Sequence, residues 1–365
     1  MESIFISPAR YIQGPNVFKT GLHHLQTLGS HALLLCDAFV YQLLGQALIT
    51  DLAALPLQAD YVEFNGESSS NEIQRLSQLA YTLNCDFVIG LGGGKTIDTA
   101  KAIAQQLQCP VAILPTVAST DAPTSAISVL YDEEGKFDRY VFYKKSPDLI
   151  LVDSEVIAKA PATLLASGIA DGLSTWIEAR AVKRSGGTTL LGAKPTATAL
   201  AIARQCETIL FEHGLQAIQD CREDRVTEAL EAVIEANTLL SGIGFESCGL
   251  AAAHAIHNGF TAIQGAIHRL NHGQKIAYTT LTQLMLEQAP KEELDCYIHL
   301  FQALELPTTL REMHLDNVNY SELLAIGELA TQAHESIHQM PFSITPSDVA
   351  DALLAVDHYV THQFK

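Results

Sequence analysis

An apolar run, a glycine cluster and a helical pattern follow one another in Phe87-Val88-Ile89-Gly90-Leu91-Gly92-Gly93-Gly94-Lys95-Thr96-Ile97-Asp98-Thr99-Ala100-Lys101-Ala102. Apolar residues at helical spacing continue this pattern to Leu107, which is typical of an amphipathic helix packed on a sheet. A strand, a glycine turn and a helix in this order present free backbone N–H groups, which bind anions well. Glycine also lets a phosphate approach the backbone without meeting a Cβ atom. The stretch predicts a βα unit whose turn either binds a phosphate or has no ligand.

Two common phosphate-binding motifs can be tested against this glycine loop by their spacing. The P-loop requires a glycine five residues before the glycine of Gly-Lys-Thr, and Ile89 occupies that position. The dinucleotide fingerprint G-x-G-x-x-G requires a glycine where Lys95 stands. A phosphate site here would therefore belong to another class, and a P-loop nucleotide kinase is disfavoured.

Length and composition restrict the class of protein. A chain of 365 residues exceeds the size at which one hydrophobic core stops growing, so we expect two domains. The hydrophobic fraction of 48% and the charged fraction of 17% indicate a folded globular protein. The net charge of −19 argues against a nucleic-acid partner, because phosphate contacts require clustered lysine and arginine.

The cysteines and the apolar runs bear on the location of the protein. The cysteines are odd in number, form no C-x-x-C pair and often lie in apolar runs, which is typical of buried reduced thiols: Cys36, Cys85, Cys109, Cys206, Cys221, Cys248 and Cys296. The sequence does not open like a signal peptide, and no apolar run approaches membrane-spanning length. We expect a soluble cytoplasmic protein with no membrane partner.

The pattern of predicted secondary structure changes near residue 160. Before it, helical segments alternate with strand candidates, which predicts a parallel α/β sheet: Ala32–Cys36, Tyr61–Phe64, Phe87–Ile89, Val111–Leu114 and Leu149–Val152. A hairpin of Ile127–Tyr131 and Phe137–Phe142 is added to the domain that contains this sheet. After it, the chain is rich in helix-forming residues, with predicted helices at Thr163–Val182, Thr196–His213, Thr227–Leu240 and Thr280–Glu287. We therefore predict an α/β domain over residues 1–160 and an all-helical domain over residues 161–365.

Two further segments follow predicted strands. Asp37 stands directly after a strand, where an acidic residue either binds the ribose of NAD or caps a helix. The hydroxyl-rich segment Thr116–Ser125 follows the strand Val111–Leu114. Because the carboxyl ends of parallel strands meet at one edge of a sheet, both segments should lie at the edge of the glycine loop. Ordinary turn chemistry would explain the hydroxyl groups equally well.

A group of histidines in the helical half could bind a metal. His254 and His257 are three residues apart, on one face of a predicted helix, and His268 and His272 follow. Asp171 lies in a mostly apolar helix, where a buried carboxylate needs a partner. Imidazoles with one carboxylate suit zinc, although satisfied core histidines would give the same pattern. The motif H-E-x-x-H is absent, so a metalloprotease has no support.

Three longer motifs stand out in the sequence: Gly92-Gly93-Gly94-Lys95-Thr96-Ile97-Asp98-Thr99-Ala100-Lys101, Ser119-Thr120-Asp121-Ala122-Pro123 and Gly244-Phe245-Glu246-Ser247-Cys248-Gly249-Leu250-Ala251-Ala252-Ala253-His254. They resemble those of the glycerol dehydrogenase family, the zinc-dependent branch of the iron-containing alcohol dehydrogenase superfamily. The likeness runs from Ser7 almost to the C-terminus. It implies the dehydroquinate synthase-like fold of that superfamily, with a Rossmann-like NAD-binding domain over 1–160 and a metal- and substrate-binding helical domain over 161–365.

The resemblance also implies roles for individual residues. NAD would be bound by Asp37, Gly94, Lys95, Asp98, Thr116, Ser119, Ser125, Ile127 and Tyr131. Zn²⁺ would be bound by Asp171, His254 and His272, which with Asp121 form the implied catalytic group. The substrate would contact Asp121, His254 and Phe245. Iron-dependent relatives carry a histidine four residues after the metal-binding aspartate, and Thr175 at that position favours zinc.

The activity implied by the resemblance is NAD-dependent oxidation of glycerol and related vicinal diols to hydroxyketones. A homo-oligomer is also implied, with an octamer as one such assembly. Two alternatives remain open: a dehydrogenase of the same superfamily that acts on a hydroxy acid or a phosphorylated polyol, and a non-catalytic nucleotide-binding protein. Arg269 and Lys275 could bind the phosphate group of a phosphorylated substrate, so that alternative remains open. A non-catalytic protein would be expected to have lost metal ligands.

Overall fold

The computed structural model describes residues 2–364, which form two compact units. The sheet unit consists of Ile6–Ala162 and Asp220–Gly242, and the helical unit of the N-terminal residues through Phe5, Thr163–Gln219 and the chain from Ile243 onward. This division lies near the predicted one, but it assigns the helical segment Asp220–Gly242 to the sheet unit. Glu231 in this segment accepts hydrogen bonds from Gln13 and from Ser154 Oγ (2.6 Å). The segment therefore belongs to the sheet unit because of its long-range contacts, although its sequence pattern is helical.

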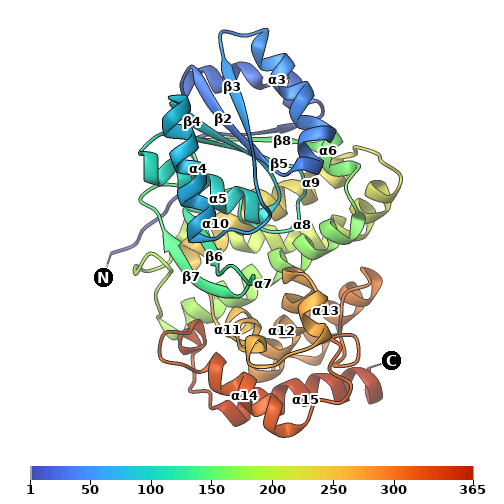
Figure 1. Ribbon diagram of the computed structural model, residues 1–365. Coiled ribbons are helices and arrows are strands. Elements are labelled where there is room, and N and C mark those ends of the chain that lie inside the picture. The colour runs from blue at the N-terminus through green and yellow to red at the C-terminus, as the bar shows by residue number, and fades with distance from the viewer. Residues whose placement is uncertain (1, 365) are drawn as a thin grey trace. The chain divides into compact units, whose positions relative to one another are not determined.

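A six-stranded parallel sheet with the order β1-β8-β5-β4-β2-β3 forms the centre of the sheet unit (Figure 1). Its strands are β1 (Tyr11–Gly14), β2 (His31–Cys36), β3 (Gln58–Glu63), β4 (Phe87–Gly92), β5 (Val111–Pro115) and β8 (Leu149–Asp153). The predicted hairpin is present as β6 (Ile127–Tyr131) and β7 (Phe137–Phe142), which form their own antiparallel sheet. The strand β1 was not predicted, because this short edge strand has a mixed composition and pairs with β8, far along the chain.

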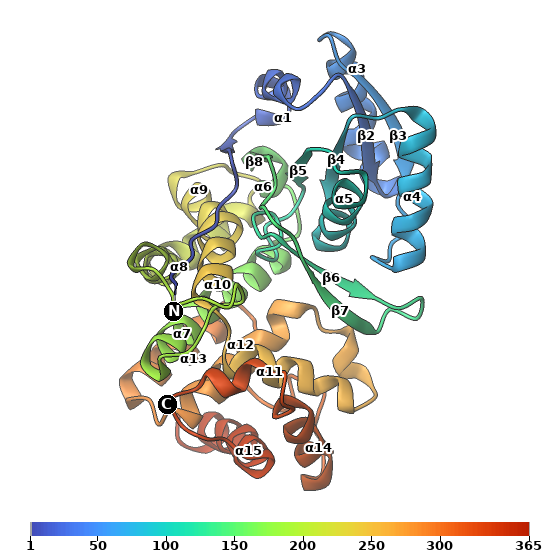
Figure 2. The ribbon, with the colours of Figure 1, turned by 90° about the vertical axis from the view of Figure 1, so that its left-hand side faces the viewer.

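Helices cover both faces of the parallel sheet. On one face, alternate residues of the strands, such as Leu34 and Ile89, join one hydrophobic core with α1 (Val17–Thr20), η1 (Leu22–Thr27) and α3 (Gln46–Ala53). The helices α4 (Ser70–Leu83) and α5 (Gly94–Leu107) lie on the other face (Figure 2). The remaining helical elements of the unit are α2 (Ala38–Val40), η2 (Tyr41–Gly45), α6 (Ser154–Ala158), α9 (Glu228–Glu235) and η3 (Ala236–Leu240). This is the predicted doubly covered α/β sheet.

The helical unit is built around α7, a helix that is buried along most of its length. Its helices are α7 (Ala162–Ser185), α8 (Ala197–Arg222), α10 (Ser241–Cys248), α11 (Ala252–Gly259), α12 (His272–Leu286), α13 (Lys291–Ala303), α14 (Tyr320–Ala330) and α15 (Pro346–His362), with the short turns η4 (Phe260–Ala262), η5 (Ala266–Arg269) and η6 (Ser336–Gln339). The helix predicted at Thr280–Glu287 is the second half of α12. That helix begins earlier because Asn271 and Gln274 form a capping box at its start.

Membrane-spanning length is not reached by any single apolar helix between residues 2 and 364. Glu228–Cys248 and Ala252–Ala262 meet the length and composition only when taken together, and they are bent by 95° relative to each other.

Candidate metal centre and cofactor loop

Three predicted cofactor segments follow neighbouring strands of the parallel sheet. Asp37 follows β2, the glycine loop follows β4 and Thr116 follows β5, and these strands are adjacent in the order β5-β4-β2. The Thr116 N–H donates to the Gly92 carbonyl (3.1 Å), which joins two of the segments directly. The sheet therefore brings the three segments to one edge, where open α/β sheets bind ligands.

The glycines of the loop serve two different purposes. A Cβ atom at Gly90 would lie 2.7 Å from Ala100 Cβ, and one at Gly92 would lie 2.7 Å from Thr96 Oγ1. These two glycines let α5 pack closely on β4. At Gly93 and Gly94 a Cβ atom would meet nothing nearer than 3.6 and 3.5 Å, so packing does not require glycine there. The glycine-rich start of α5 therefore fits a bound phosphate.

An ion pair stands beside this loop. Lys95 Nζ lies 2.7 Å from Glu67 Oε2 and 4.9 Å from the centre of the Tyr131 ring. Burial raises the pKa of the Tyr131 hydroxyl, so this side chain remains a neutral phenol. Lys95 and Tyr131 were predicted as cofactor residues, whereas Glu67, which comes from the segment after β3, was not predicted.

Asp98 is turned toward the protein. It is 6% exposed, its Oδ1 lies 2.9 Å from Lys101 Nζ, and its Oδ2 accepts a hydrogen bond from the Val129 N–H (3.0 Å). Burial raises the pKa of Asp98, and the Lys101 ammonium works against that rise. These contacts join α5 to the start of the hairpin, so Asp98 shapes the predicted cofactor site. Its direct contact with NAD stays a prediction.

The other predicted cofactor residues differ in exposure. Asp37 Oδ1 accepts a hydrogen bond from the Val40 N–H (2.8 Å) and caps α2, which is the alternative role considered from the sequence. Thr116 and Ser119 are partly exposed, whereas Ser125 and Ile127 are buried. The binding of NAD by all five stays a prediction.

The three predicted metal ligands lie together in the helical unit. Asp171 comes from α7, His254 from α11 and His272 from the first position of α12. The Asp171 carboxylate is 1% exposed, and its Oδ1 lies 3.1 Å from His272 Nε2 and 3.7 Å from His254 Nε2. One ligand atom from each residue lies within 4.8 Å of the others, a set of two nitrogens and one oxygen that can hold a metal ion.

The start of α12 is held against α7, which places His272 beside Asp171. The Gly273 N–H donates to Ser167 Oγ (3.2 Å), and the same hydroxyl donates to Asn271 Oδ1 (2.9 Å). A Cβ atom at Gly273 would overlap the Ser167 carbonyl, so only glycine allows this approach. Gln274 closes the capping box with Asn271.

The electrostatics of the three residues suit a cation. Burial raises the pKa of Asp171, but the charges and hydrogen bonds of His272 and His254 outweigh it and hold the pKa below its ordinary range. Asp171 Oδ2 is buried and has no hydrogen-bond partner among residues 2–364. Burial lowers the pKa of His254, but Glu178 and Asp171 reverse this and raise it well above its ordinary value. An orphaned carboxylate oxygen next to two imidazoles fits a divalent metal.

Two further side chains stand behind the histidine ligands. Glu178 Oε2 lies 2.6 Å from His254 Nδ1, and His257 Nε2 lies 3.2 Å from His272 Nδ1. Burial, His272 and Lys275 lower the pKa of His257 well below its ordinary value, so its ring stays neutral and its Nε2 can accept a hydrogen bond from the Nδ1–H of His272. His257 was predicted to share a helical face with His254, whereas Glu178 was not predicted to belong to the site. The only sequence signal for Glu178 is its position two turns after Asp171 on the same helix.

A second group of possible ligands lies in the sheet unit at His31, Asp60 and Cys85. His31 Nε2 and Asp60 Oδ2 form an ion pair of 2.6 Å. Burial raises the pKa of the Cys85 thiol to about 11, with smaller contributions from nearby acidic residues. A metal would have to displace that proton, because the thiolate is the ligand. The group is therefore a weaker candidate than the one around Asp171.

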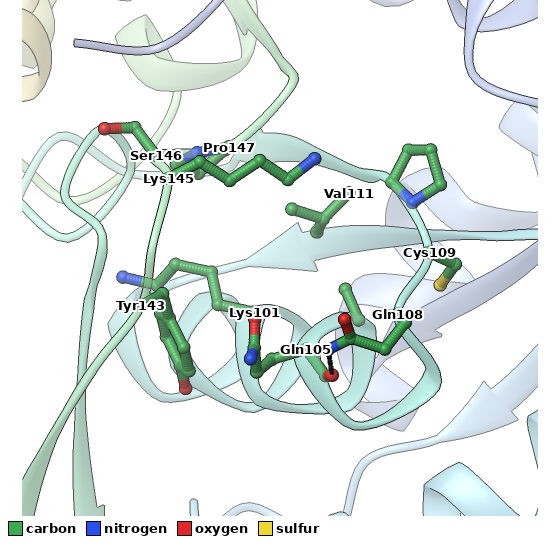
Figure 3. A pocket seen from close by; sticks show the side chains of 11 residues that line it. Lys101, Gln105, Gln108, Cys109, Val111, Tyr143, Lys145, Ser146 and Pro147 are labelled. Carbon is green, nitrogen blue, oxygen red and sulfur yellow. Dashed lines mark hydrogen bonds between the residues drawn. The ribbon is translucent and has the colours of Figure 1, made fainter. Parts of the chain in front are cut away.

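A cavity of about 240 Å³ in the sheet unit lies away from the glycine loop (Figure 3). It is lined by the second half of α5, the start of β5 and the segment Tyr143–Pro147. Figure 3 shows Lys145 extending along one wall toward Val111. None of the predicted cofactor residues lines this cavity, so it has no part in the proposed site.

Two predicted substrate residues belong to different units. Asp121 lies in the sheet unit, where its Oδ2 accepts a hydrogen bond from Ser241 Oγ (3.2 Å). Phe245 lies in α10 and is 9% exposed. Their contacts with a substrate stay predictions.

Comparisons with known proteins agree with the geometry. A family profile described as iron-containing alcohol dehydrogenase matches residues 8–154. A glycerol dehydrogenase of Escherichia coli O6:H1 is 47% identical over 98% of both chains. A glycolaldehyde reductase of Halobacterium salinarum is 46% identical over 98% of both chains. The crystal structure of glycerol dehydrogenase from Schizosaccharomyces pombe superposes with a TM-score of 0.95 at 42% identity, covering 99% of this chain and 91% of that one.

Proposed function

This chain belongs to the iron-containing alcohol dehydrogenase family of oxidoreductases, and we propose that it is an NAD-dependent, zinc-containing glycerol dehydrogenase. It oxidises glycerol and related vicinal diols to hydroxyketones, with dihydroxyacetone as the product from glycerol. The similar proteins named glycerol dehydrogenase support the substrate, with identities of 43–47% over nearly the whole chain.

The observation that carries the proposal is the grouping of Asp171, His254 and His272. Their ligand atoms lie within 4.8 Å of one another, and one carboxylate oxygen is buried without a partner in the described chain. A nucleotide-binding protein without catalytic activity would have no use for this buried group. The residues therefore favour an enzyme over a protein that only binds a nucleotide.

The chemistry requires a metal and a cofactor. The bound metal supplies a Lewis acid that makes a substrate hydroxyl more acidic, and NAD⁺ supplies the acceptor for a hydride. Asp171, His254 and His272 would hold the metal, while Gly94 and Lys95 would hold the cofactor phosphates. We assign the remaining substrate hydroxyl to the Asp121 carboxylate and the orientation of the cofactor ribose to Asp37.

Zinc is the proposed metal because of the number of ligands. Three protein ligands leave the fourth position of a tetrahedral site open, as catalytic zinc requires. Thr175 lies one helical turn after Asp171 and is buried, where iron-dependent members of the resembled superfamily have a histidine. A threonine does not add an imidazole ligand to the group.

A second candidate is a reductase of hydroxyaldehydes, favoured by the 46% identity to the glycolaldehyde reductase. It would use the same residues, because a diol and a hydroxycarbonyl are the two sides of one hydride transfer. A phosphorylated polyol is less favoured. Arg269 is exposed, and burial lowers the pKa of Lys275, which weakens it as a phosphate ligand.

Location and assembly complete the proposal. We propose a cytoplasmic enzyme that acts as a homo-oligomer on a small diol, with no nucleic-acid or membrane partner. All seven cysteines are free thiols, as is usual in a reducing compartment.

The proposal is tested by measuring metal content and NADH formation on the same purified protein. We expect chelator-sensitive oxidation of glycerol, 1,2-propanediol or 2,3-butanediol, with little turnover of hydroxy acids. Reduction of dihydroxyacetone and of glycolaldehyde in the reverse assay separates the two candidate substrates. His254→Ala should lose both zinc and turnover while still binding NAD. A variant that kept zinc and a normal kcat would refute the assignment.

A further inference from the structure

The helix α11, which carries His254, begins without a cap of its own. Its N-cap residue is Ala251, whose side chain cannot accept a hydrogen bond. The first backbone N–H groups of a helix nevertheless need acceptors when they are buried. Two side chains from other helices supply them. Glu178 Oε1 accepts from the N–H groups of Ala251 (2.8 Å) and His254 (3.0 Å). Gln283 Oε1 accepts from the N–H groups of Ala252 (3.0 Å) and Ala253 (2.9 Å), which lie between them.

Glu178 differs from Gln283 in what its second oxygen does. Glu178 Oε2 lies 2.6 Å from His254 Nδ1, and the side chain is 0% exposed. The two backbone bonds to Oε1 fix the plane of the carboxylate, so Oε2 has one position. A carboxylate only accepts hydrogen bonds, so the proton of a neutral His254 must sit on Nδ1. The lone pair then sits on Nε2, the nitrogen that faces Asp171 at 3.7 Å.

We propose that Glu178 is a positioning residue of the metal centre, which selects the ligating tautomer and the ring orientation of His254. The inference rests on the proposed function, since it concerns the metal of that site. Glu178 also supplies a second negative charge. With the charge of Asp171 it would balance the charge of a divalent ion. Partners of this kind usually change metal affinity by about 10- to 100-fold when they are lost.

A purely structural role as a helix cap is the competing explanation, and Glu178→Gln separates the two. If the amide oxygen of the variant caps α11, its NH₂ group faces His254 Nδ1 and moves the imidazole proton to Nε2. If the amide is reversed, two buried N–H groups lose their acceptor. The first arrangement keeps the helix end and loses the ligand tautomer. Gln283→Met is the matched control, because it removes a cap from the same helix end without touching His254.

The experiment compares metal-stripped wild type, Glu178→Gln and Gln283→Met. Zinc affinity is measured by competition with a chromophoric chelator, the geometry of the site by the visible spectrum of added Co²⁺, and folding by the melting temperature without metal. We expect Glu178→Gln to bind zinc about 10- to 100-fold more weakly than wild type. We expect Gln283→Met to melt at a lower temperature and to keep zinc affinity within about threefold of wild type.

Equal zinc affinity in wild type and Glu178→Gln would overturn the inference. So would an equal loss of affinity in both variants, because that would follow from capping alone. If Glu178→Gln does not fold, ¹⁵N NMR of histidine-labelled, zinc-loaded wild type decides. A proton on Nδ1 of His254 supports the inference, and a proton on Nε2 overturns it. A wild-type protein that binds neither zinc nor cobalt would overturn the metal centre of the proposed function, and this inference with it.

Discussion

Replacing Lys101 by methionine should strongly destabilise the sheet unit. Lys101 Nζ is almost fully buried, lies 2.9 Å from Asp98 Oδ1 and donates to the carbonyl oxygens of Ala122 (3.0 Å) and Ile127. Ser125 adds its carbonyl at 3.4 Å. One ammonium group thus joins α5 to the segment that carries two predicted cofactor residues. Methionine keeps most of the side-chain volume and removes every one of these interactions.

The magnitude follows from the burial of the pair. Removing one partner of a buried ion pair costs about 3–5 kcal/mol, because the other charge is left without compensation. Burial already raises the pKa of Asp98, and without Lys101 the folded-state pKa rises further. A carboxyl group with a raised folded-state pKa binds its proton more tightly in the folded state than in the unfolded state. The free energy of unfolding therefore falls as the pH rises from about 4, the unfolded-state pKa, through the folded-state pKa. The loss in Lys101→Met should therefore be smaller at pH 5 than at pH 7.5.

The assay is urea unfolding of wild type, Lys101→Met, Asp98→Asn and the double variant at both pH values. The double variant should lose less stability than the sum of the single variants, with a coupling of up to about 3 kcal/mol. Lys145→Met is the control, because Lys145 also forms an ion pair, with its Nζ 2.5 Å from Asp148 Oδ1, but is 62% exposed. The free energy of unfolding of this variant should therefore fall by less than about 1 kcal/mol. A Lys101→Met loss below about 1 kcal/mol, or one that does not change with pH, would refute the reasoning.

Three further predictions use other parts of the molecule. Gly273→Ala should weaken zinc binding at least about tenfold, because the added Cβ forces the start of α12 away from α7. The control is Gly214→Ala inside α8, where the nearest atom to an added Cβ lies at 3.6 Å. This variant should stabilise the fold by about 0.5–1 kcal/mol, measured by thermal unfolding. Burial raises the pKa of Glu72, but hydrogen bonds from Arg75 and Asn65 outweigh burial and lower it. Glu72→Gln should therefore lower the free energy of unfolding in urea by about 1.5–3 kcal/mol at pH 7, and by less as the pH falls below about 4. Asp37→Asn keeps a helix cap but removes the charge, so the ratio of kcat/KM for NADP⁺ to that for NAD⁺ should rise about tenfold, and an unchanged ratio would leave Asp37 with the capping role alone.

The sequence predicts well where structure is local. The strand, turn and helix around Gly92 to Gly94 follow from spacing alone, and the observed elements β4 and α5 confirm them. The choice of Asp171, His254 and His272 as the three ligands came from resemblance, because Asp171 lies more than eighty positions before the histidines and shares no local pattern with them. The structure brings them together in one compact unit.

The sequence does not show the contacts that a residue makes with distant parts of the chain. Asp98, in the first turns of α5, is predicted to contact the cofactor, and that contact stays a prediction. The hydrogen bond that its carboxylate accepts from the Val129 N–H in β6 has no signal in the local pattern. The sequence Ala251-Ala252-Ala253 contains no cap, so nothing local marks the start of α11. Its caps are Glu178 and Gln283, on two other helices. A cap supplied from elsewhere in the chain leaves no trace in a local pattern.

One face of α7 acts as a template for the metal centre. Ser167, Asp171 and Glu178 are separated by four and seven residues, about one and two helical turns, and so point to the same side. Ser167 holds the start of α12 through Gly273. Asp171 lies against both histidine ligands, and Glu178 holds the start of α11 through the backbone and side chain of His254. Each ligand histidine thus stands at a helix end that α7 itself fixes. The positions of all three ligands are therefore set by the register of one buried helix rather than by the loops between helices.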